Sequence, residues 1–281
     1  MRILRTAADV RAAVVEVRTG GATVGLVPTM GAFHDGHISL MRAARDAHDL
    51  VVVSLFVNPT QFGPAEDLAA YPRDEQRDAR IAEQAGVDIL FAPSVAEMYP
   101  DGFSTTIHVS GLTDVMDGAA RPGHFDGVAT VVAKLFAIVG PDAAYFGQKD
   151  AQQLLVVRRV ARDLNLPVRV VGCPIVREPD GLAMSSRNVY LDAADRAGAT
   201  ALHRALVAAE DVVARGSTSA DVILDAARAE LRAAGIQPEY LDLRSPDDLT
   251  EVDDAAPAAL LAVAARMGAA RLIDNTLLET R

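Results

Sequence analysis

Short apolar runs alternate with helical stretches over the first 176 residues of this chain. The runs are bounded by turns and cover residues 24–27, 51–57, 88–91, 143–146 and 168–176. The stretches with helical spacing cover residues 7–18, 37–47, 74–85, 127–139 and 151–164. Short, uninterrupted apolar runs are typical of strands that are buried on both faces. The alternation therefore predicts an α/β domain with a doubly wound parallel sheet, which binds ligands at the carboxyl ends of its strands.

The pattern changes after residue 176. Residues 177–181 predict a turn that can serve as a hinge. Asp192 is a candidate N-cap for an Ala-rich helix that ends near residue 215, and Gly235 ends a second predicted helix. Three strands follow, at residues 240–243, 259–265 and 271–275. We therefore predict two domains, residues 1–176 with the parallel sheet and residues 177–281 as a smaller α+β domain.

Charge and cysteine content exclude several classes of protein. The net charge of the 281-residue chain is −11, which argues against non-specific binding to nucleic acid or to an anionic membrane surface. The single cysteine, Cys173, excludes an intrachain disulfide and fits a reducing cytosol. A catalytic thiol is one alternative for Cys173, but its apolar surroundings favour a small core residue.

The sequence shows neither a signal peptide nor a membrane span. The N-terminus lacks the long apolar segment of a signal peptide. No window reaches the ~20 apolar residues of a membrane helix, because Lys134 interrupts the longest candidate, residues 128–139. We therefore expect a soluble cytoplasmic protein.

The segment PTMGAFHDGH, from Pro28 to His37, carries the strongest functional signal. It follows a predicted strand and precedes a predicted helix, so a tight turn brings His34, Gly36 and His37 together at a helix start. Free backbone N–H groups and the positive end of the helix dipole attract phosphate there. Gly36 allows a flat nucleotide to lie against the backbone. This H-x-G-H pattern is that of nucleotidyl transferases, although two histidines alone could also be surface residues or half of a metal site.

Two further segments carry polar groups before residue 130. FVNPTQFG contains Gln61, whose amide can bind a substrate hydroxyl or carboxylate without adding charge. RPGHF contains Arg121 and His124, and the guanidinium is a bidentate donor for oxyanions. Taken singly, Gln61 is a turn-stabilising amide and Arg121 a solvated side chain.

Two later segments add positive charge and hydroxyl groups. FGQKD places Lys149 where a triphosphate would approach, and Asp150 suits a ribose hydroxyl, a helix cap or both. MSSRN places Arg187 and two serines on a flexible loop, which suits a mobile phosphate clamp. The alternative for this loop is an exposed polar segment.

In this order, the motifs PTMGAFHDGH, FVNPTQFG, RPGHF, FGQKD and MSSRN closely resemble those of the pantothenate synthetase family. These enzymes are AMP-forming pantoate–β-alanine ligases of the nucleotidyltransferase superfamily. The resemblance implies a Rossmann-like doubly wound sheet domain with a smaller C-terminal α+β domain as a lid. It also implies ATP-dependent condensation of pantoate with β-alanine to pantothenate, through pantoyl adenylate, with release of AMP and pyrophosphate.

The resemblance assigns roles to the matching positions of this chain. The catalytic groups, which would contact and neutralise phosphates, are His34, His37, Lys149, Ser185, Ser186 and Arg187. ATP would be bound by Met30, His37, Gly147, Lys149, Asp150, Val176, Met184, Ser185, Ser186 and Arg187. Pantoate would be bound by Pro28, Met30, Gln61 and Gln153. Arg121 would lie near the amine substrate.

The resemblance further implies ATP as a substrate, Mg²⁺ held mainly by the ATP phosphates, and a homodimer that binds neither nucleic acid nor a membrane. Three departures from the family pattern stand out. Phe33 and Asp35 occupy positions that often carry Leu and Glu, and Ala151 replaces the usual aromatic residue. The acidic residues of segment 74–78 also differ, so no protein ligand to magnesium is assigned there.

Two other classes compete with this interpretation. One is a different enzyme of the superfamily, such as a cytidylyltransferase or a fragment of an aminoacyl-tRNA synthetase, but the chain lacks a K-M-S-K-S loop and a basic face. The other is a non-catalytic binding or regulatory dimer. Retention of His34, His37, Lys149 and Arg187 argues against that class, because the fold alone does not require them.

Overall fold

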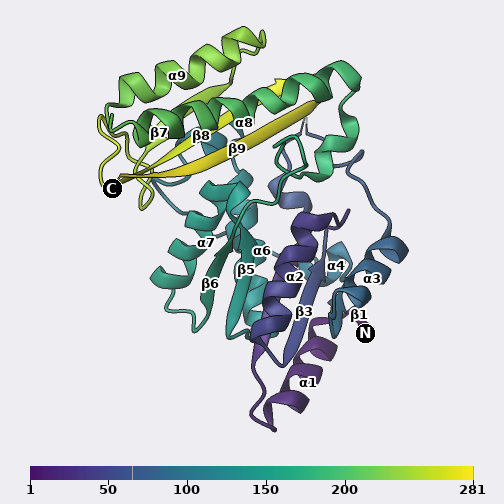
Figure 1. Ribbon diagram of the computed structural model, residues 1–281. Helices are drawn as coiled ribbons and strands as arrows, with labels where there is room; N and C mark the ends of the chain where they lie inside the picture. Colours follow the sequence, from purple (N-terminus) through teal and green to yellow (C-terminus); the bar gives the residue numbers. More distant parts are fainter. Residues whose placement is uncertain (65, 281) are drawn as a thin grey trace. The chain divides into compact units, whose positions relative to one another are not determined.

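The computed structural model describes residues 1–64 and 66–280. The chain forms two compact units (Figure 1). The first unit contains Met1–Gln148 and Gln152–Pro174, and the second contains Lys149–Ala151 and the chain from Ile175 onward. None of the helices in the described part of the chain is long and apolar enough to cross a membrane.

A six-stranded parallel sheet forms the centre of the first unit, with the strand order β1-β4-β3-β2-β5-β6. Its strands are β1 Arg2–Leu4, β2 Val24–Thr29, β3 Leu50–Leu55, β4 Ile89–Phe91, β5 Ala143–Gly147 and β6 Arg169–Cys173. The predicted doubly wound parallel sheet is confirmed. The edge strand β1 was not predicted, because three residues that include an exposed arginine carry no recognisable strand pattern.

Helices cover both faces of this sheet, because its central side chains are buried on both sides. The main helices are α1 Ala7–Arg18, α2 Asp35–Ala47, α3 Glu75–Gln84, α6 His124–Val139 and α7 Ala151–Asp163. The short helices are α4 Val95–Met98, α5 Met116–Ala120, and the 3₁₀ turns η1 Pro59–Gln61 and η2 Gln148–Asp150. Val27 belongs to a core cluster with Met41 of α2 and Ala82 of α3. Leu26, the next residue along β2, faces the other way and is also fully buried. The predicted core position of Cys173 is confirmed, because the free thiol is buried in the same cluster as Val27.

The direction in which the chain adds strands to the sheet reverses between β2 and β5. From β2 the chain proceeds outward through β3 and β4, and it then returns to the other side of β2 with β5 and β6. β2 pairs with β3 along all six of its residues, but its pairing with β5 comprises only Gly25–Ala143 and Leu26–Ala144. The carboxyl-terminal halves of β2 and β5 therefore separate at the switch point where open α/β sheets bind their ligands.

A close backbone contact fixes the turn that follows β3. Helix α6 presents Gly127 to this turn, and a Cβ atom at that position would overlap the Thr60 carbonyl and lie 2.6 Å from the Gln61 nitrogen. Only glycine permits this approach, because the obstructing atoms are backbone. Gly127 therefore sets the position of Gln61 relative to the sheet.

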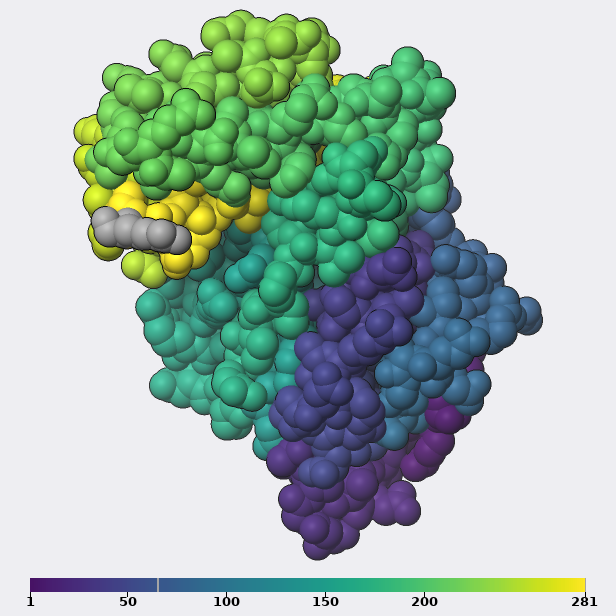
Figure 2. Space-filling view, viewed as in Figure 1, coloured from purple at the N-terminus to yellow at the C-terminus, as the bar shows by residue number. Residues whose placement is uncertain are grey.

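The second unit is an α+β layer with an antiparallel sheet, in the order β7-β8-β9. Its strands are β7 Tyr240–Arg244, β8 Ala258–Met267 and β9 Ala270–Glu279, and its helices are α8 Ala193–Ala214, α9 Ala220–Ala233 and the 3₁₀ turn η3 Ser186–Tyr190. α8 and α9 form the green outer surface of this unit in Figure 2. The predicted N-cap is confirmed, because the Asp192 side chain accepts a hydrogen bond from the Asp195 nitrogen at 2.8 Å. Alanines such as Ala199 and Ala205 are fully buried, so the high alanine content serves close helix packing.

We expect Gly127→Ala to lower the free energy of unfolding by about 1–3 kcal/mol, because the added methyl group overpacks a site walled by backbone. Gly198→Ala in α8 is the matched control, since its Cβ would meet only the flexible end of Met267, at 3.1 Å. Urea denaturation followed by circular dichroism measures both variants. Equal stability of Gly127→Ala and the unsubstituted protein would contradict the proposed backbone contact.

Candidate active site

The chain leaves β2 through a tight turn with two left-handed residues. Gly31 has φ +93° and Ala32 has φ +53°, a region that glycine adopts readily and that residues with a side chain adopt rarely. A side chain at position 31 would also lie 2.6 Å from the Leu55 Cδ1 atom and 2.9 Å from an Asp78 oxygen. Pro28 lies within β2, and Met30 lies between the strand and this turn. The predicted turn therefore exists, and its shape depends on glycine.

The chain then enters α2, and His34 and His37 lie at the start of this helix. The predicted helix start at His37 is two residues late, because His34 itself is the N-cap and α2 begins at Asp35. The His34 Nδ1 atom accepts a hydrogen bond from the Gly36 nitrogen at 3.2 Å, and the His37 Nδ1 atom accepts one from the His34 nitrogen at 3.4 Å. A side-chain acceptor on this first turn satisfies N–H groups that the helix leaves unpaired.

These two hydrogen bonds determine which tautomer each ring adopts when it is neutral. Because each Nδ1 atom accepts from a backbone N–H, each Nε2 atom carries the hydrogen. The ring centroids of His34 and His37 are 4.2 Å apart. Two N–H donors at a helix N-terminus form an arrangement that suits an anionic oxygen.

Two side chains of α3 grip the backbone of this turn. The Asp78 carboxylate accepts hydrogen bonds from the Ala32 nitrogen at 2.8 Å and from the Phe33 nitrogen at 2.9 Å. The neighbouring Arg77 donates to the Phe33 carbonyl at 3.0 Å. The sequence analysis did not identify Asp78 or Arg77 as site residues, because nothing local distinguishes them from other charges on an amphipathic helix.

Gln61 follows β3 and is held by Asn58, which the sequence analysis also missed. The Asn58 Oδ1 atom accepts from the Tyr99 hydroxyl at 2.8 Å and from the Thr60 hydroxyl at 2.9 Å. Its Nδ2 group therefore donates, to the Gln61 Oε1 atom at 3.0 Å and to the Gly127 carbonyl at 3.1 Å. The Oε1 atom of Gln61 is thus occupied, and the Nε2 group of this buried amide remains as a donor.

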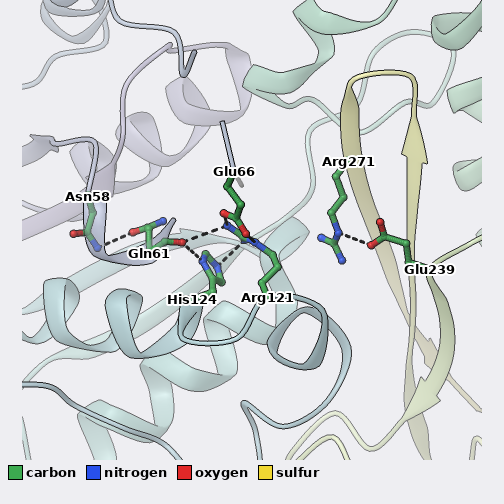
Figure 3. Close-up of polar contacts among 7 residues, drawn as sticks. All are labelled: Asn58, Gln61, Glu66, Arg121, His124, Glu239 and Arg271. Atoms are coloured by element: carbon green, nitrogen blue, oxygen red, sulfur yellow. Dashed lines mark hydrogen bonds and ion pairs between the residues drawn. The ribbon is translucent and has the colours of Figure 1, made fainter. Parts of the chain in front are cut away.

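Arg121 and His124 hold the main chain of Gln61 from the other side (Figure 3). The Arg121 guanidinium pairs with the Glu66 carboxylate at 2.6 Å and lowers the pKa of that carboxyl. It also lies 3.0 Å from the His124 Nε2 atom. The His124 Nδ1 atom is 2.8 Å from the Gln61 carbonyl, which can only accept, so Nδ1 carries the hydrogen. The other ion pair in the figure, Arg271 with Glu239 at 2.6 Å, belongs to the second unit.

His124 is neutral because of these surroundings. Burial, followed by the positive charge of Arg121, lowers the pKa of His124 to about 4. Arg121 is mostly buried in this network and is not the solvated side chain that its Gly/Pro loop alone suggests. Its contact with an amine substrate stays a prediction.

The FGQKD segment continues from β5. Gly147 ends this strand as predicted. The Lys149 ammonium lies 3.2 Å from an Asp150 oxygen, and the Asn275 side chain donates to the Lys149 carbonyl at 2.8 Å. Gln153 is half-buried on the first turn of α7, whereas the preceding Gln152 is buried and bonds to the backbone of residues 112–117.

A hairpin positions the MSSRN segment in the second unit. The Met184 nitrogen donates to the Val176 carbonyl at 3.0 Å, which places these two predicted adenosine contacts side by side. Ser185 is the N-cap of η3 and accepts a hydrogen bond from the Arg187 nitrogen at 3.3 Å, and Ser186 begins that turn. Arg177 anchors the hairpin through a 2.6 Å ion pair with the buried Asp274.

Among residues 1–64 and 66–280, no three His, Cys, Asp or Glu residues cluster as a metal site would require. Each acidic side chain of segment 74–78 has a structural partner. Asp74 caps α3, Glu75 pairs with Arg5, and Asp78 binds the turn. Mg²⁺ bound through phosphate oxygens and water needs few protein ligands.

The parallel sheet and the H-x-G-H turn after β2 define this chain as an α/β protein with a candidate phosphate-binding site at the switch point of its sheet. The family model for pantoate-beta-alanine ligase matches residues 2–277. The chain belongs to this family, and the predicted resemblance is confirmed.

Similar proteins match the chain over nearly its whole length. The pantothenate synthetase of Roseiflexus castenholzii is 53% identical over 280 residues, which cover 99% of this chain and 100% of the relative. The crystal structure of pantothenate synthetase from Thermus thermophilus has a TM-score of 0.94 and 52% identity, and the match covers 98% of this chain and 99% of that one. The pantoate-beta-alanine ligase of Francisella tularensis, in complex with beta-gamma ATP and beta-alanine, has a TM-score of 0.79 and 32% identity, over 100% and 99% of the two chains.

We expect His124→Gln to reduce the acid sensitivity of the fold. The pKa of His124 falls from 6.5 to about 4 on folding, so below pH 6.5 the unfolded chain binds a proton that the folded chain does not. Stability is lost as the pH falls through this window, by up to about 2 kcal/mol at pH 5. Urea unfolding at pH 7.5 and pH 5 should show a loss smaller by that amount in the variant.

His108→Gln is the control for the loss of an imidazole at the surface, because His108 is exposed and lies 2.9 Å from Asp126. An unchanged pH dependence in His124→Gln would contradict a neutral, buried His124.

Proposed function

We propose that this chain catalyses the reaction of its family, the ATP-dependent condensation of pantoate with β-alanine to pantothenate, with release of AMP and pyrophosphate. Family membership over residues 2–277 supports the proposal. The observation that carries it is the pair of imidazoles, His34 and His37, at the helix N-terminus beside the switch point of the sheet. In its neutral form each ring would donate through Nε2, which suits the oxygens of a phosphate that is under attack.

The positive and polar groups of the later motifs would bind ATP. Lys149, Ser185, Ser186 and Arg187 would neutralise the phosphates, and Met30 would line the site. Gly147, Asp150, Val176 and Met184 would hold the adenosine. The hydrogen bonds that orient Met184 on Val176 and Arg187 on Ser185 support the assignment of these residues to one loop.

Pantoate would bind to neutral groups. Because Asn58 occupies the Oε1 atom of Gln61, the Nε2 group of Gln61 would donate to a carboxylate or hydroxyl oxygen of pantoate. Gln153 would supply a second amide, and Pro28 and Met30 would supply apolar surface. Neutral amides suit a hydroxy acid, since positive charge here would compete with the phosphate-binding groups for ATP.

The chemistry would proceed in two displacements without a covalent enzyme intermediate. A pantoate carboxylate oxygen attacks the α-phosphorus of ATP, the bond to the bridging oxygen breaks, and pyrophosphate leaves. The β-alanine nitrogen then attacks the activated acyl carbon, the bond to the phosphate oxygen breaks, AMP leaves, and the amine loses its proton. Cys173 is a poor alternative nucleophile, because burial raises the pKa of its thiol.

Four further assignments complete the proposal. Mg²⁺ would be held mainly by ATP phosphates and would neutralise part of their charge. The C-terminal unit would act as a lid that protects the acyl adenylate from water. The enzyme would work in the cytoplasm as a homodimer. Light scattering measures the oligomeric state.

The reaction predicts a strict substrate requirement. AMP release in a coupled assay should require ATP, pantoate and β-alanine together. In a single turnover with ATP, Mg²⁺ and pantoate, pyrophosphate should appear in a burst before β-alanine is added, because adenylation needs only the acid. Arg187→Ala should weaken the burst, since the phosphates lose a bidentate donor.

Other outcomes would identify the competing classes. Pyrophosphate release that depends on β-alanine would contradict a separate adenylation step. Transfer of the nucleotide to a stable product would indicate another enzyme of the superfamily, and nucleotide binding without turnover would indicate a regulatory protein.

Gln61→Ala should raise the KM for pantoate by about 10- to 100-fold, the cost of a hydrogen bond to a charged group, and should change the KM for ATP little. Asn58→Asp tests the orientation of the amide. A carboxylate oxygen would face the Gln61 Oε1 atom and turn the amide over, so the KM for pantoate should rise although Gln61 is retained. Steady-state kinetics measure both constants, and an equal effect on both substrates would exclude the assignment.

A further inference from the structure

We infer that Asp78, with Arg77, is a positioning residue for the adenylation step, because together they fix the peptide group that carries His34 and orients His37. The inference rests on the proposed role of the two imidazoles. The hydrogen bonds from Asp78 and Arg77 to this turn go to the backbone of Ala32 and Phe33, so an effect on adenylation would pass through the histidines that follow.

The Asp78 carboxylate is 1% exposed, and each of its oxygens is used. Oδ2 accepts from Ala32 and Oδ1 accepts from Phe33, so two consecutive N–H groups converge on one side chain. Ala32 has a left-handed conformation that is unfavourable for a residue with a side chain. The two charge-assisted hydrogen bonds therefore hold a turn that the local sequence does not favour.

Arg77 holds the next backbone group along the chain, on the side of the histidines. It donates to the Phe33 carbonyl at 3.0 Å. That carbonyl and the His34 N–H belong to one planar peptide group, and the His34 N–H donates to the His37 Nδ1 atom at 3.4 Å. A rotation of this peptide group would thus move His34 directly and remove the hydrogen bond that orients His37.

The side chain of Phe33 adds a second constraint on His37. Phe33 is 1% exposed and belongs to the core cluster beneath α2. Its ring centroid lies 5.5 Å from that of His37. Phe33 is therefore held by its N–H, its carbonyl and its side chain. Its position in turn determines the positions of the two imidazoles.

This arrangement calls for a carboxylate at position 78. Asparagine has one acceptor oxygen, so Asp78→Asn would direct an NH₂ group at one of the two backbone donors. The turn would relax, and a shift of about 1 Å in a catalytic group can cost on the order of 100-fold in rate. We expect Asp78→Asn to lower the kcat of pyrophosphate–ATP exchange at least ~10-fold and to change the KM for ATP less than ~3-fold.

A double-mutant cycle separates positioning from general destabilisation. His37→Ala alone should lower the exchange rate by ~100-fold or more. In the His37→Ala background, Asp78→Asn should cost clearly less than it does alone, since one of the two rings through which it acts is missing. Asp142→Asn is the matched control. Asp142 also binds a backbone nitrogen, Val24 at 2.7 Å, and an arginine, Arg18 at 3.0 Å, but at the start of the strands. It should retain the kcat of the unsubstituted enzyme.

Arg77→Gln keeps the test valid if Asp78→Asn does not fold, because the Arg77 side chain is 49% exposed and its loss leaves the core intact. Like Asp78→Asn, it should lower kcat, and its effect on kcat should be smaller in the His37→Ala background than in the unsubstituted enzyme. Fully multiplicative losses for either substitution and His37→Ala would overturn the positioning role. If His37→Ala alone had the same exchange rate as the unsubstituted enzyme, the proposed role of the imidazoles would be overturned instead.

Discussion

The peptide group between Phe33 and His34 is the constraint on which the candidate site depends. Its carbonyl accepts from Arg77, its N–H reaches the His37 ring, and the adjoining Phe33 N–H is bound by Asp78. Because a peptide group is planar, fixing one end fixes the other. The position of α3 therefore helps to determine where the two imidazoles lie at the switch point of the sheet.

Hydrogen-bond partners give three histidines of the first unit different roles. His34 and His37 accept backbone hydrogen bonds at Nδ1, so each neutral ring donates through Nε2. His124 donates through Nδ1 to the Gln61 carbonyl and meets Arg121 with Nε2, which keeps the ring neutral and structural. The three residues are of the same type, but their surroundings differ. His34 and His37 are candidate hydrogen-bond donors to a phosphate, whereas His124 supports Gln61, whose amide is a candidate contact for the substrate.

Much of the architecture could be predicted because it depends on local pattern. The uninterrupted apolar runs that became β3 and β5 indicate strands buried on both faces, and the Asp192 N-cap follows from residue type and position. The start of α2 was predicted two residues late, because a histidine is an unusual N-cap. Asp78 could not be predicted as a site residue, since its partner Phe33 is 45 positions away in the sequence and meets it only through tertiary packing.

The most direct test of this account is the tautomeric state of the histidine rings. Long-range ¹H–¹⁵N correlation spectra of the protein, which has six histidines, resolve protonated from unprotonated ring nitrogens. Single substitutions assign the signals of His34, His37 and His124. At neutral pH the account predicts Nε2–H for neutral His34 and His37 and Nδ1–H for His124. A hydrogen on Nδ1 of neutral His34 or His37 would contradict it, because the backbone hydrogen bonds that orient these rings could not then exist.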